Sequence, residues 1–462
     1  MKKRISSLLS ILIALSSCTF TACQEESGPV NNGDALTLTV ASWDEYIDEG
    51  GSFYEDEETE KFRAWFQDLY GVDLTTSQPI YEEFEAWYFN KTGKEISVEY
   101  IPLQDNETMY NKIKMGDSYD LLCPSEYMMM KLQAEGLLQE YPDSFFDTTN
   151  EENYYARNLS PYIKQVFDDG NWTKYIAGYM WGSTGFVYNT DIIQPNSVME
   201  SWSALTSEAC NWTITAKDNA RDSYFAGLGL YYENELLALK ANYESGKITY
   251  EEYRTELENK MNDTSDSTIQ GVKKKLEAMR GNLYGLETDE GKMDVAMGRI
   301  GASYQWSGDA VAILDKAGKG VNLEYSIPQA ASNLWFDGWT MMKHVDEETA
   351  EAAMMFINYL SRPENVIRNM YYIGYTSCIA GDDVFNYISD QYSATEVDTD
   401  VTEYSLDYFF GEGHKLIVPV EATKTQLFAQ YPDEKTKDRL VVMRYFDKEV
   451  NEKVNRMWIN IK

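Results

Sequence analysis

Histidine is scarce in this chain of 462 residues, which contains only His344 and His414. Neither lies near a serine, a cysteine or a metal-type cluster in the sequence that would build a hydrolytic triad or a zinc site. The sequence also lacks a G-x-x-x-x-G-K-[ST] phosphate loop and a dinucleotide-binding glycine pattern after its first predicted strand. These absences argue against histidine-dependent hydrolysis and nucleotide chemistry, and the sequence calls for no metal or cofactor.

Cysteine and long apolar runs are also rare. Cys123, Cys210 and Cys378 are isolated from one another, which fits neither a disulfide framework nor a C-x-x-C metal site. We therefore expect all three to be small core residues. No segment approaches the roughly 20 uninterrupted apolar residues that a transmembrane helix needs.

The N-terminal segment, residues 1–22, has the composition of a secretory signal, because three basic residues precede an apolar run over residues 8–15. The sequence Leu-Ser-Ser-Cys ending at Cys18 resembles the lipobox of bacterial lipoproteins, in which the cysteine is diacylated and becomes the mature N-terminus. Cys23 also follows small residues, and the polar stretch 24–34 comes directly after it. We expect lipidation at Cys18 or Cys23 with 24–34 as a tether; the alternative is an ordinary cleaved signal.

Basic residues are few compared with acidic ones. The chain has 40 Lys and Arg against 76 Asp and Glu, a formal net charge of −36. Such a charge repels nucleic acid and anionic lipid and steers cations to the surface. Solubility of an exported protein explains the bulk charge equally well, so only the placement of particular carboxylates can indicate a cationic ligand.

The chain length and the order of predicted elements indicate an α/β protein of two domains, since about 440 mature residues exceed one compact domain. Alternation of strands and helices predicts a mostly parallel sheet with helices on both faces. Residues 233–281 are highly charged and helical in pattern, and we expect a solvated helical excursion there. Predicted strands cover 35–42, 95–101, 119–123, 175–188, 212–216, 301–306 and 335–341, and predicted helices cover 60–70, 80–92, 107–115, 126–136, 220–230 and 347–360.

Three distant segments, 42–47, 119–127 and 334–339, interleave aromatic side chains with carboxylates. An aromatic face attracts a cation through its quadrupole, while a carboxylate neutralises the charge. Carboxylates and aromatic rings that converge from distant segments are typical of a receptor for an organic cation. Asp337 is the strongest candidate, because it is flanked by aromatic residues and an unpaired buried carboxylate is costly.

These segments, with 106–110, 218–222 and 373–375, occur in an order that resembles the spermidine/putrescine-binding proteins of bacterial ABC transporters, the PotD-like family. The resemblance covers nearly the whole mature chain, except for extra residues around 48–77 and 233–263. It implies a two-lobed, type II periplasmic-binding-protein-like α/β fold with the ligand between the lobes. We expect lobe 1 to comprise 35–174 and 336–385, and lobe 2 to comprise 175–335 and 386–462.

The resemblance also implies the residues of the ligand site. A polyamine is a chain of ammonium groups separated by methylenes, so its receptor needs carboxylates at the charges and flat apolar surfaces along the linkers. The implied ligand-binding residues are Trp43, Glu45, Tyr46, Ser125, Tyr127, Asn219, Asp222, Trp306, Trp335, Asp337 and Tyr375.

One departure from the family pattern affects the expected ligand. Asn219 stands where the spermidine receptor carries a carboxylate, and Asp222 replaces a longer glutamate. The loss of one charge favours a diamine such as putrescine over spermidine. Glu126 could restore the charge, although we expect it to be a solvent-facing acid at the start of a helix.

The resemblance implies a binding protein without enzymatic activity, held outside the cytoplasm by a lipid anchor. Its partners would be the polyamine, a membrane permease and an ATPase on another chain. Alternatives are a receptor for sugars or another small solute on the same fold, a surface protein that uses the fold for adhesion, and a secreted glycosidase, because acid pairs and aromatic platforms also suit sugars.

Overall fold

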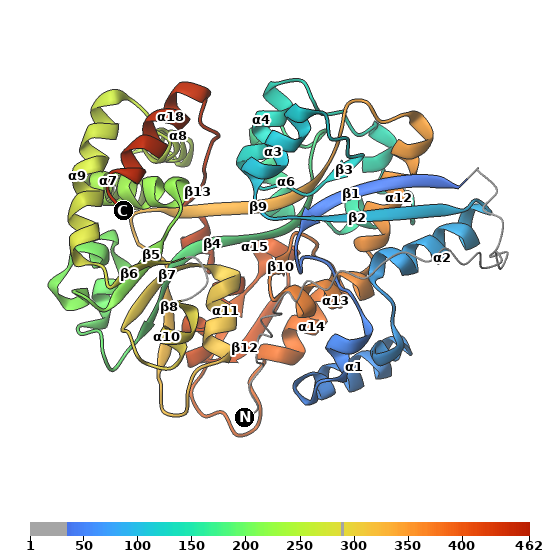
Figure 1. Ribbon diagram of the computed structural model, residues 1–462. Helices are drawn as coiled ribbons and strands as arrows, with labels where there is room; N and C mark the ends of the chain where they lie inside the picture. Colours follow the sequence, from blue (N-terminus) through green and yellow to red (C-terminus); the bar gives the residue numbers. More distant parts are fainter. Residues whose placement is uncertain (1–34, 288–290) are drawn as a thin grey trace, which may run out of the picture. The chain divides into compact units, whose positions relative to one another are not determined.

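The computed structural model describes residues 35–287 and 291–462 (Figure 1). The predicted signal sequence, the tether and both candidate lipidation sites, Cys18 and Cys23, lie outside the described residues. Contacts within the chain gather Leu36–Lys462 into one compact unit. Among the residues that the structure describes, no helix is both long enough and apolar enough to cross a bilayer.

A mixed sheet of 11 strands runs through this unit along the path β2-β1-β3-β9-β4-β7-β5-β6. β8 and β10 pair with β4, β13 pairs with β9, and β11 and β12 form a separate pair. The strands are β1 (Leu36–Trp43), β2 (Ile96–Leu103), β3 (Leu121–Leu122), β4 (Ala177–Asn189), β5 (Ile214–Lys217), β6 (Gly285–Glu287), β7 (Ala302–Trp306), β8 (Leu323–Ser326), β9 (Ser332–Met341), β10 (Thr376–Ser377), β11 (Val401–Ser405), β12 (Lys415–Pro419) and β13 (Leu440–Val442).

The expectation of a mostly parallel sheet is wrong, because two parallel arms are joined by antiparallel strands. β1 is parallel to β2 and β3, and β5 is parallel to β6 and β7. Between the arms, β4 runs antiparallel to β7, β8, β9 and β10. Every residue of β4 and β9 is buried, so a hydrophobic pattern could not reveal their direction.

Helices cover both faces of the sheet, as predicted; Figure 1 shows α3 and α4 on one side of β1 and β9 and α13 and α14 on the other. The α-helices are α1 (Glu60–Tyr70), α2 (Ile80–Thr92), α3 (Asn106–Met115), α4 (Glu126–Ala134), α5 (Tyr154–Asn158), α6 (Pro161–Gly170), α7 (Ala220–Glu244), α8 (Tyr250–Met261), α9 (Asp266–Asn282), α10 (Lys292–Ala296), α11 (Ser307–Asp315), α12 (Glu347–Leu360), α13 (Pro363–Ile373), α14 (Asp382–Tyr392), α15 (Asp407–Phe410), α16 (Gln426–Gln430), α17 (Glu434–Lys437) and α18 (Lys448–Ile459).

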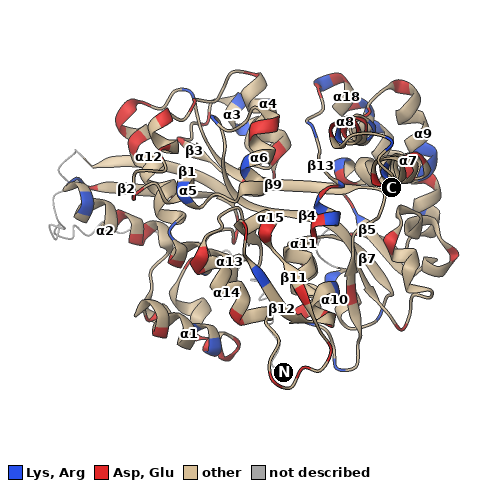
Figure 2. Ribbon diagram, turned by 180° about the vertical axis from the view of Figure 1, so that it is seen from behind, with Lys and Arg blue, Asp and Glu red and all other residues tan. Residues whose placement is uncertain are grey.

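Residues 233–281 form helices, as expected, but the expectation that this segment is solvated throughout is wrong. One face of each helix packs into a second hydrophobic core, where Leu236, Leu257 and Leu276 are completely buried. Most acidic and basic side chains of α8 and α9 are exposed or half-buried. Figure 2 marks both kinds of residue by colour along these two helices. The alternating charges in the sequence therefore predicted only the outer faces of these helices and missed the buried inner faces.

The two hydrophobic cores do not by themselves set lobe limits. The smaller core gathers side chains from α7, α8 and α9 with parts of β5, β7 and α18, and the larger core contains the rest. The lobe boundaries given above remain a prediction. Cys123, Cys210 and Cys378 are buried and free, which confirms that they are core residues.

The extra segment 48–77 is anchored by a buried ion pair. The Asp48 carboxylate accepts hydrogen bonds from Arg368 Nε on α13 (2.7 Å), the Tyr54 hydroxyl (2.9 Å) and the Gly50 N–H (2.6 Å). Arg368 Nη1 also donates to Glu83 on α2 (2.7 Å). Because Asp48 is fully buried and Arg368 nearly so, each charge depends on the other for its stability in the core.

Replacing Asp48 with asparagine should lower the free energy of unfolding by about 3–5 kcal/mol, because it leaves the Arg368 charge buried without its main partner. Urea denaturation followed by tryptophan fluorescence measures the loss. The matched control is Glu348→Gln, which breaks the exposed pair with Lys94 and should cost at most about 0.5 kcal/mol. Equal losses in the two variants would contradict the anchoring role.

Candidate functional site

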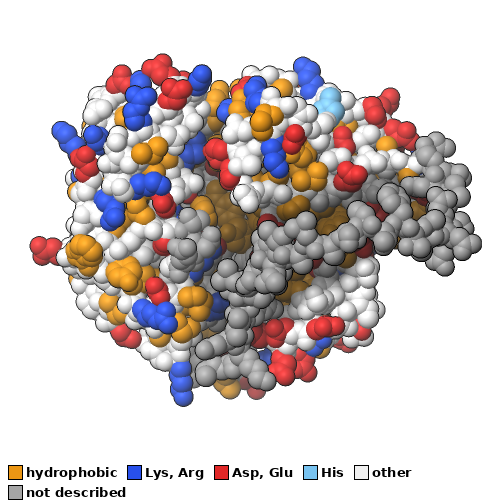
Figure 3. Space-filling view, in the orientation of Figure 1, with side chains coloured by type: hydrophobic (Ala, Val, Ile, Leu, Met, Phe, Trp, Pro, Cys, Tyr) orange, Lys and Arg blue, Asp and Glu red, His pale blue; other side chains and the backbone are white. Residues whose placement is uncertain are grey.

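A cavity of about 440 Å³ lies where the two parallel arms of the sheet meet the central strands. Figure 3 shows a recess lined by hydrophobic side chains between the part that carries α7 and α8 and the part that carries α3 and α4. The cavity is lined by Trp43, Tyr46, Gln104, Asp105, Asn106, Glu107, Ser125, Glu126, Tyr127, Asn219, Arg221, Asp222, Trp306, Asn333, Trp335, Asp337, Tyr375 and Met443.

The structure brings ten of the eleven sequence-predicted site residues to this cavity. Trp43 ends β1 and Trp306 ends β7, while Ser125 precedes α4 and Asn219 precedes α7. These are carboxyl ends of strands and amino ends of the helices that follow, where α/β sheets place their ligands. The ten residues are Trp43, Tyr46, Ser125, Tyr127, Asn219, Asp222, Trp306, Trp335, Asp337 and Tyr375.

Glu45 is the one candidate that does not line the cavity. It is exposed, and its backbone adopts a left-handed conformation with φ 53°. Its neighbours Trp43 and Tyr46 both contribute to the wall. The turn after β1 therefore directs the two aromatic side chains inward while Glu45 stays at the surface.

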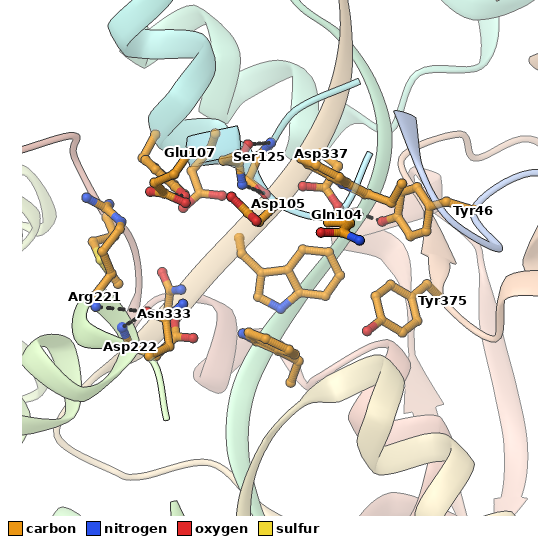
Figure 4. A pocket seen from close by; sticks show the side chains of 18 residues that line it. Tyr46, Gln104, Asp105, Glu107, Ser125, Arg221, Asp222, Asn333, Asp337 and Tyr375 are labelled. Atoms are coloured by element: carbon orange, nitrogen blue, oxygen red, sulfur yellow. Dashed lines mark hydrogen bonds between the residues drawn. The ribbon is translucent and has the colours of Figure 1, made fainter. Parts of the chain in front are cut away.

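Asp337 occupies one end of the cavity, in the middle of β9. Its Oδ2 accepts a hydrogen bond from the Tyr46 hydroxyl at 2.6 Å, and its backbone bridges to Ser125 (Figure 4). Burial raises the pKa of Asp337 to about 6, although hydrogen bonds from Tyr46, Ser125 and Trp43 oppose the shift. Among the described residues, no Lys, Arg or His lies within 4.0 Å of this carboxylate.

Further carboxylates line the cavity, those of Asp105, Glu107, Glu126 and Asp222. Figure 4 shows Glu107 and Asp222 on the side of the cavity opposite Tyr46. Glu126 is 4% exposed, so its expected solvent-facing position is wrong. Burial raises the pKa of Glu126 to about 8 against the lowering effect of Arg221, and burial raises the pKa of Asp222 to about 6. Each of these two acids holds its proton more tightly than an exposed acid does.

Asn219 has a structural task at the start of α7. Its Oδ1 accepts hydrogen bonds from the backbone N–H groups of Arg221 (2.8 Å) and Asp222 (3.1 Å). The side chain is therefore the N-cap of the helix and satisfies donors that would otherwise lack partners. The cap fixes the first turn of α7, which carries Asp222 into the cavity.

The aromatic walls are held by close packing. The Tyr375 ring lies against Tyr46 and Trp335, with centroid distances of 5.9 and 5.4 Å. A side chain at Gly308 would clash with Tyr375, since an added Cβ would lie 2.0 Å from the ring. Lys217 Nζ lies 3.8 Å from the Trp306 ring centroid, which fixes that indole from behind the strand end.

Sequence reasoning did not identify several residues that line the cavity. Arg221 and Glu107 lie inside motifs that carry the family resemblance, so their positions offered a signal. Asn333 offered none, yet its Oδ1 is buried and lacks a hydrogen-bond partner among the described residues. Asn106 also lies in one of these motifs, and the remaining residues missed are Gln104, Asp105 and Met443.

No group of three or more His, Cys, Asp or Glu side chains in residues 35–287 and 291–462 is arranged to hold a metal ion. The carboxylates of the cavity instead alternate with six aromatic rings. This combination can bind an organic cation, because the rings cover its apolar parts and the carboxylates balance its charge.

Several known proteins are similar to this chain in sequence and in fold. A spermidine/putrescine-binding periplasmic protein of Salmonella typhimurium is 26% identical over 291 residues, covering 62% of this chain and 71% of the relative. The putrescine-binding periplasmic protein PotF of Escherichia coli is 23% identical over 388 residues, covering 82% and 87%.

Two solved structures share the fold across 92% of this chain. The spermidine/putrescine ABC transporter substrate-binding protein PotD of Streptococcus pneumoniae is 24% identical, with a TM-score of 0.57 over 98% of that chain. A putative spermidine/putrescine ABC transporter protein of Listeria monocytogenes is 23% identical, with a TM-score of 0.58 over 99%. The fold is thus the two-lobed α/β fold expected from the sequence.

A profile described as bacterial extracellular solute-binding protein matches residues 80–394, about two thirds of the chain. The match contains α3, α4, α7, β7 and β9, which supply most of the cavity wall. The chain therefore belongs to the family of bacterial extracellular solute-binding proteins.

Proposed function

We propose that the chain is the extracytoplasmic receptor of an ABC importer and that it binds a polyamine, putrescine or spermidine, in the cavity around Asp337. The observation that carries this proposal is a set of three buried carboxylates without ion-pair partners. Among the described residues, no basic side chain lies within 4.0 Å of Glu126, Asp222 or Asp337. Uncompensated buried charges are costly, so a cationic ligand is the partner that the site requires.

A polyamine also matches the remaining walls. Its ammonium groups would pair with Asp337, Asp222 and Glu126, and its methylenes would lie along Trp306 and Trp335. Each cation–π contact adds about 0.5–2 kcal/mol when water is excluded. The unpartnered Asn333 Oδ1 would accept a hydrogen bond from one ammonium group.

The relatives support the same ligand class, because their names specify spermidine, putrescine or both. Glu126 supplies a buried carboxylate that offsets the charge missing at Asn219. The cavity therefore keeps carboxylates at both ends, which suits a ligand with two or three positive charges.

The transport role also belongs to the proposal. The receptor, anchored by lipid at Cys18 or Cys23, would close its two lobes around the amine and deliver it to a permease. Energy would come from an ATPase on another chain. Hinge closure between two α/β lobes is a common way for binding proteins to trap a ligand.

A sugar or another neutral solute on the same fold is the alternative ligand. Stacking on Trp43, Trp306 and Trp335 would suit a sugar, but neutral hydroxyls would leave three buried carboxylates uncompensated. The matched family consists of solute-binding proteins, so it lends no support to a glycosidase, and the lack of enzymatic activity is part of the proposal.

Calorimetry with putrescine, spermidine, spermine and a panel of neutral sugars tests the function. We expect at least one amine to bind with a dissociation constant of about 1 μM or below, which corresponds to about −8 kcal/mol. The sugars should give no heat at the same concentrations. Sugar binding without amine binding would refute the proposal.

Replacing Asp337 with asparagine should weaken amine binding by about 100-fold or more, because the ligand ammonium would be buried without its opposite charge. The change keeps the side-chain shape, so circular dichroism should show an intact fold. Glu45→Gln is the matched control and should change affinity by less than about threefold, since screened surface charges contribute little. Equal effects of the two changes would mean that Asp337 does not contact the ligand.

Affinity should rise with pH from about pH 5 to about pH 8, because protons and the ligand compete for the same carboxylates. The pKa values of Asp337 and Asp222 near 6 and of Glu126 near 8 set this range. A bound cation favours the ionised acids, so binding should release protons. Calorimetry in buffers of different ionisation enthalpy measures the release, and Glu126→Gln should reduce it at pH 7. Constant affinity without proton release would contradict this assignment.

A further inference from the structure

A second cavity of about 210 Å³ adjoins the outer end of the ligand cavity. The two share Glu107, Tyr127 and Arg221 as a common wall. On its far side the outer cavity is bordered by α3, α4 and the residues before α18, including Tyr110, Lys131 and Phe446. A ligand that extends past Tyr127 would therefore enter it.

Arg221 is the first unusual feature of this wall. It is 9% exposed, and its guanidinium lies between two rings, 3.8 Å from the Tyr127 centroid and 4.5 Å from that of Phe446. Its Nη2 donates a hydrogen bond to the Arg444 carbonyl at 2.9 Å. Among the described residues, no carboxylate lies within 4.0 Å of its guanidinium. A guanidinium has five N–H donors, so most of its hydrogen-bonding capacity stays available.

Lys131 is the second unusual feature. Its Nζ lies 3.4 Å from the Tyr110 ring centroid, and no carboxylate in the described part of the chain lies within 4.0 Å of it. Among the described residues, Glu107 is the one acid on the wall of this cavity, and its Oε1 accepts a hydrogen bond from the Tyr127 hydroxyl at 3.0 Å. The chain has a net charge of −36. Two basic side chains that have no ion-pair partner among the described residues therefore make the charge around this small cavity unusually positive.

We propose that the outer cavity is a subsite for an anionic oxygen group, and that besides putrescine or spermidine the receptor takes an amine whose far end carries a carboxylate. This inference rests on the proposed function, because the amine end would occupy the inner cavity. Its carboxylate would pass the Tyr127 ring and lie between Arg221 and Lys131. A planar guanidinium and an ammonium group both bind carboxylates through strong charge-assisted hydrogen bonds.

A matched pair of ligands tests the subsite. N-succinylputrescine and N-butyrylputrescine have acyl tails of equal length, which end in a carboxylate and in a methyl group. By calorimetry, the succinyl compound should bind about tenfold more tightly than the butyryl compound, as expected for a desolvated ion pair. Equal affinities, or tighter binding of the butyryl compound, would overturn the proposal.

Lys131→Gln provides the matched variant, because Lys131 borders only the outer cavity. It should reduce the preference for the succinyl compound by about threefold or more, and binding of putrescine itself should not change. An unchanged preference would show that the carboxylate does not lie between the two cations. Loss of putrescine binding in this variant would place Lys131 in the amine site and would also contradict the proposal.

Acetate distinguishes a free anion from the tail of a solute. If acetate raises the melting temperature of the ligand-free protein more than chloride at equal ionic strength, and Lys131→Gln abolishes the difference, the subsite exists. If acetate stabilises the protein but the two acyl ligands bind equally well, the cavity binds a separate small anion. That result would overturn the proposal that the solute carries the carboxylate. If no amine binds, the proposed function fails, whereas the acetate result still decides the subsite.

Discussion

Burial of carboxylate charge without a basic partner is the constraint on which the site depends. The Asp337 carboxylate accepts a hydrogen bond from the Tyr46 hydroxyl. Glu126 lies at the start of α4, and burial raises its pKa against the smaller, lowering effect of the Arg221 charge. A buried carboxylate without a counter-ion stays partly protonated near neutral pH. Burial thus favours the protonated form of these acids, most strongly for Glu126, whose pKa is raised to about 8.

The central antiparallel strands explain how distant segments build this site. β9 contributes Asn333, Trp335 and Asp337, which alternate along one face of the strand because side chains repeat every second residue. β3 and β4 flank β9, so the Ser125 turn meets Asp337 directly. The parallel arms then supply their strand ends, with Trp43 from one arm and Trp306 from the other. The correction to the sheet direction is therefore also the reason that both arms converge on one cavity.

The sequence predicted the local elements of the fold well and the environment of single charges poorly. Apolar periodicity located α1, α2 and α12 to the residue, and the strand ends carried aromatic residues to the cavity. The same patterns failed for Glu126, because a helix-start acid looks alike whether it faces solvent or a cavity. The environments of Arg221 and Asn333 could not be predicted for the same reason. Whether a buried polar group has a partner depends on how the folded chain packs around it.

Asn219 shows why a count of charges along the sequence misjudges the ligand. Its side-chain oxygen accepts two backbone N–H groups of α7, and an aspartate in that position would engage the same donors. A carboxylate in the cap position would interact with the first-turn N–H groups and with the helix dipole. Its electrostatic attraction to a ligand cation would therefore be weaker than that of a free carboxylate. The change to asparagine therefore removes less attraction than a full charge. Under the proposed function, the preference between two and three ammonium groups would be set by Asp337, Asp222 and Glu126, which have no ion-pair partner among the described residues.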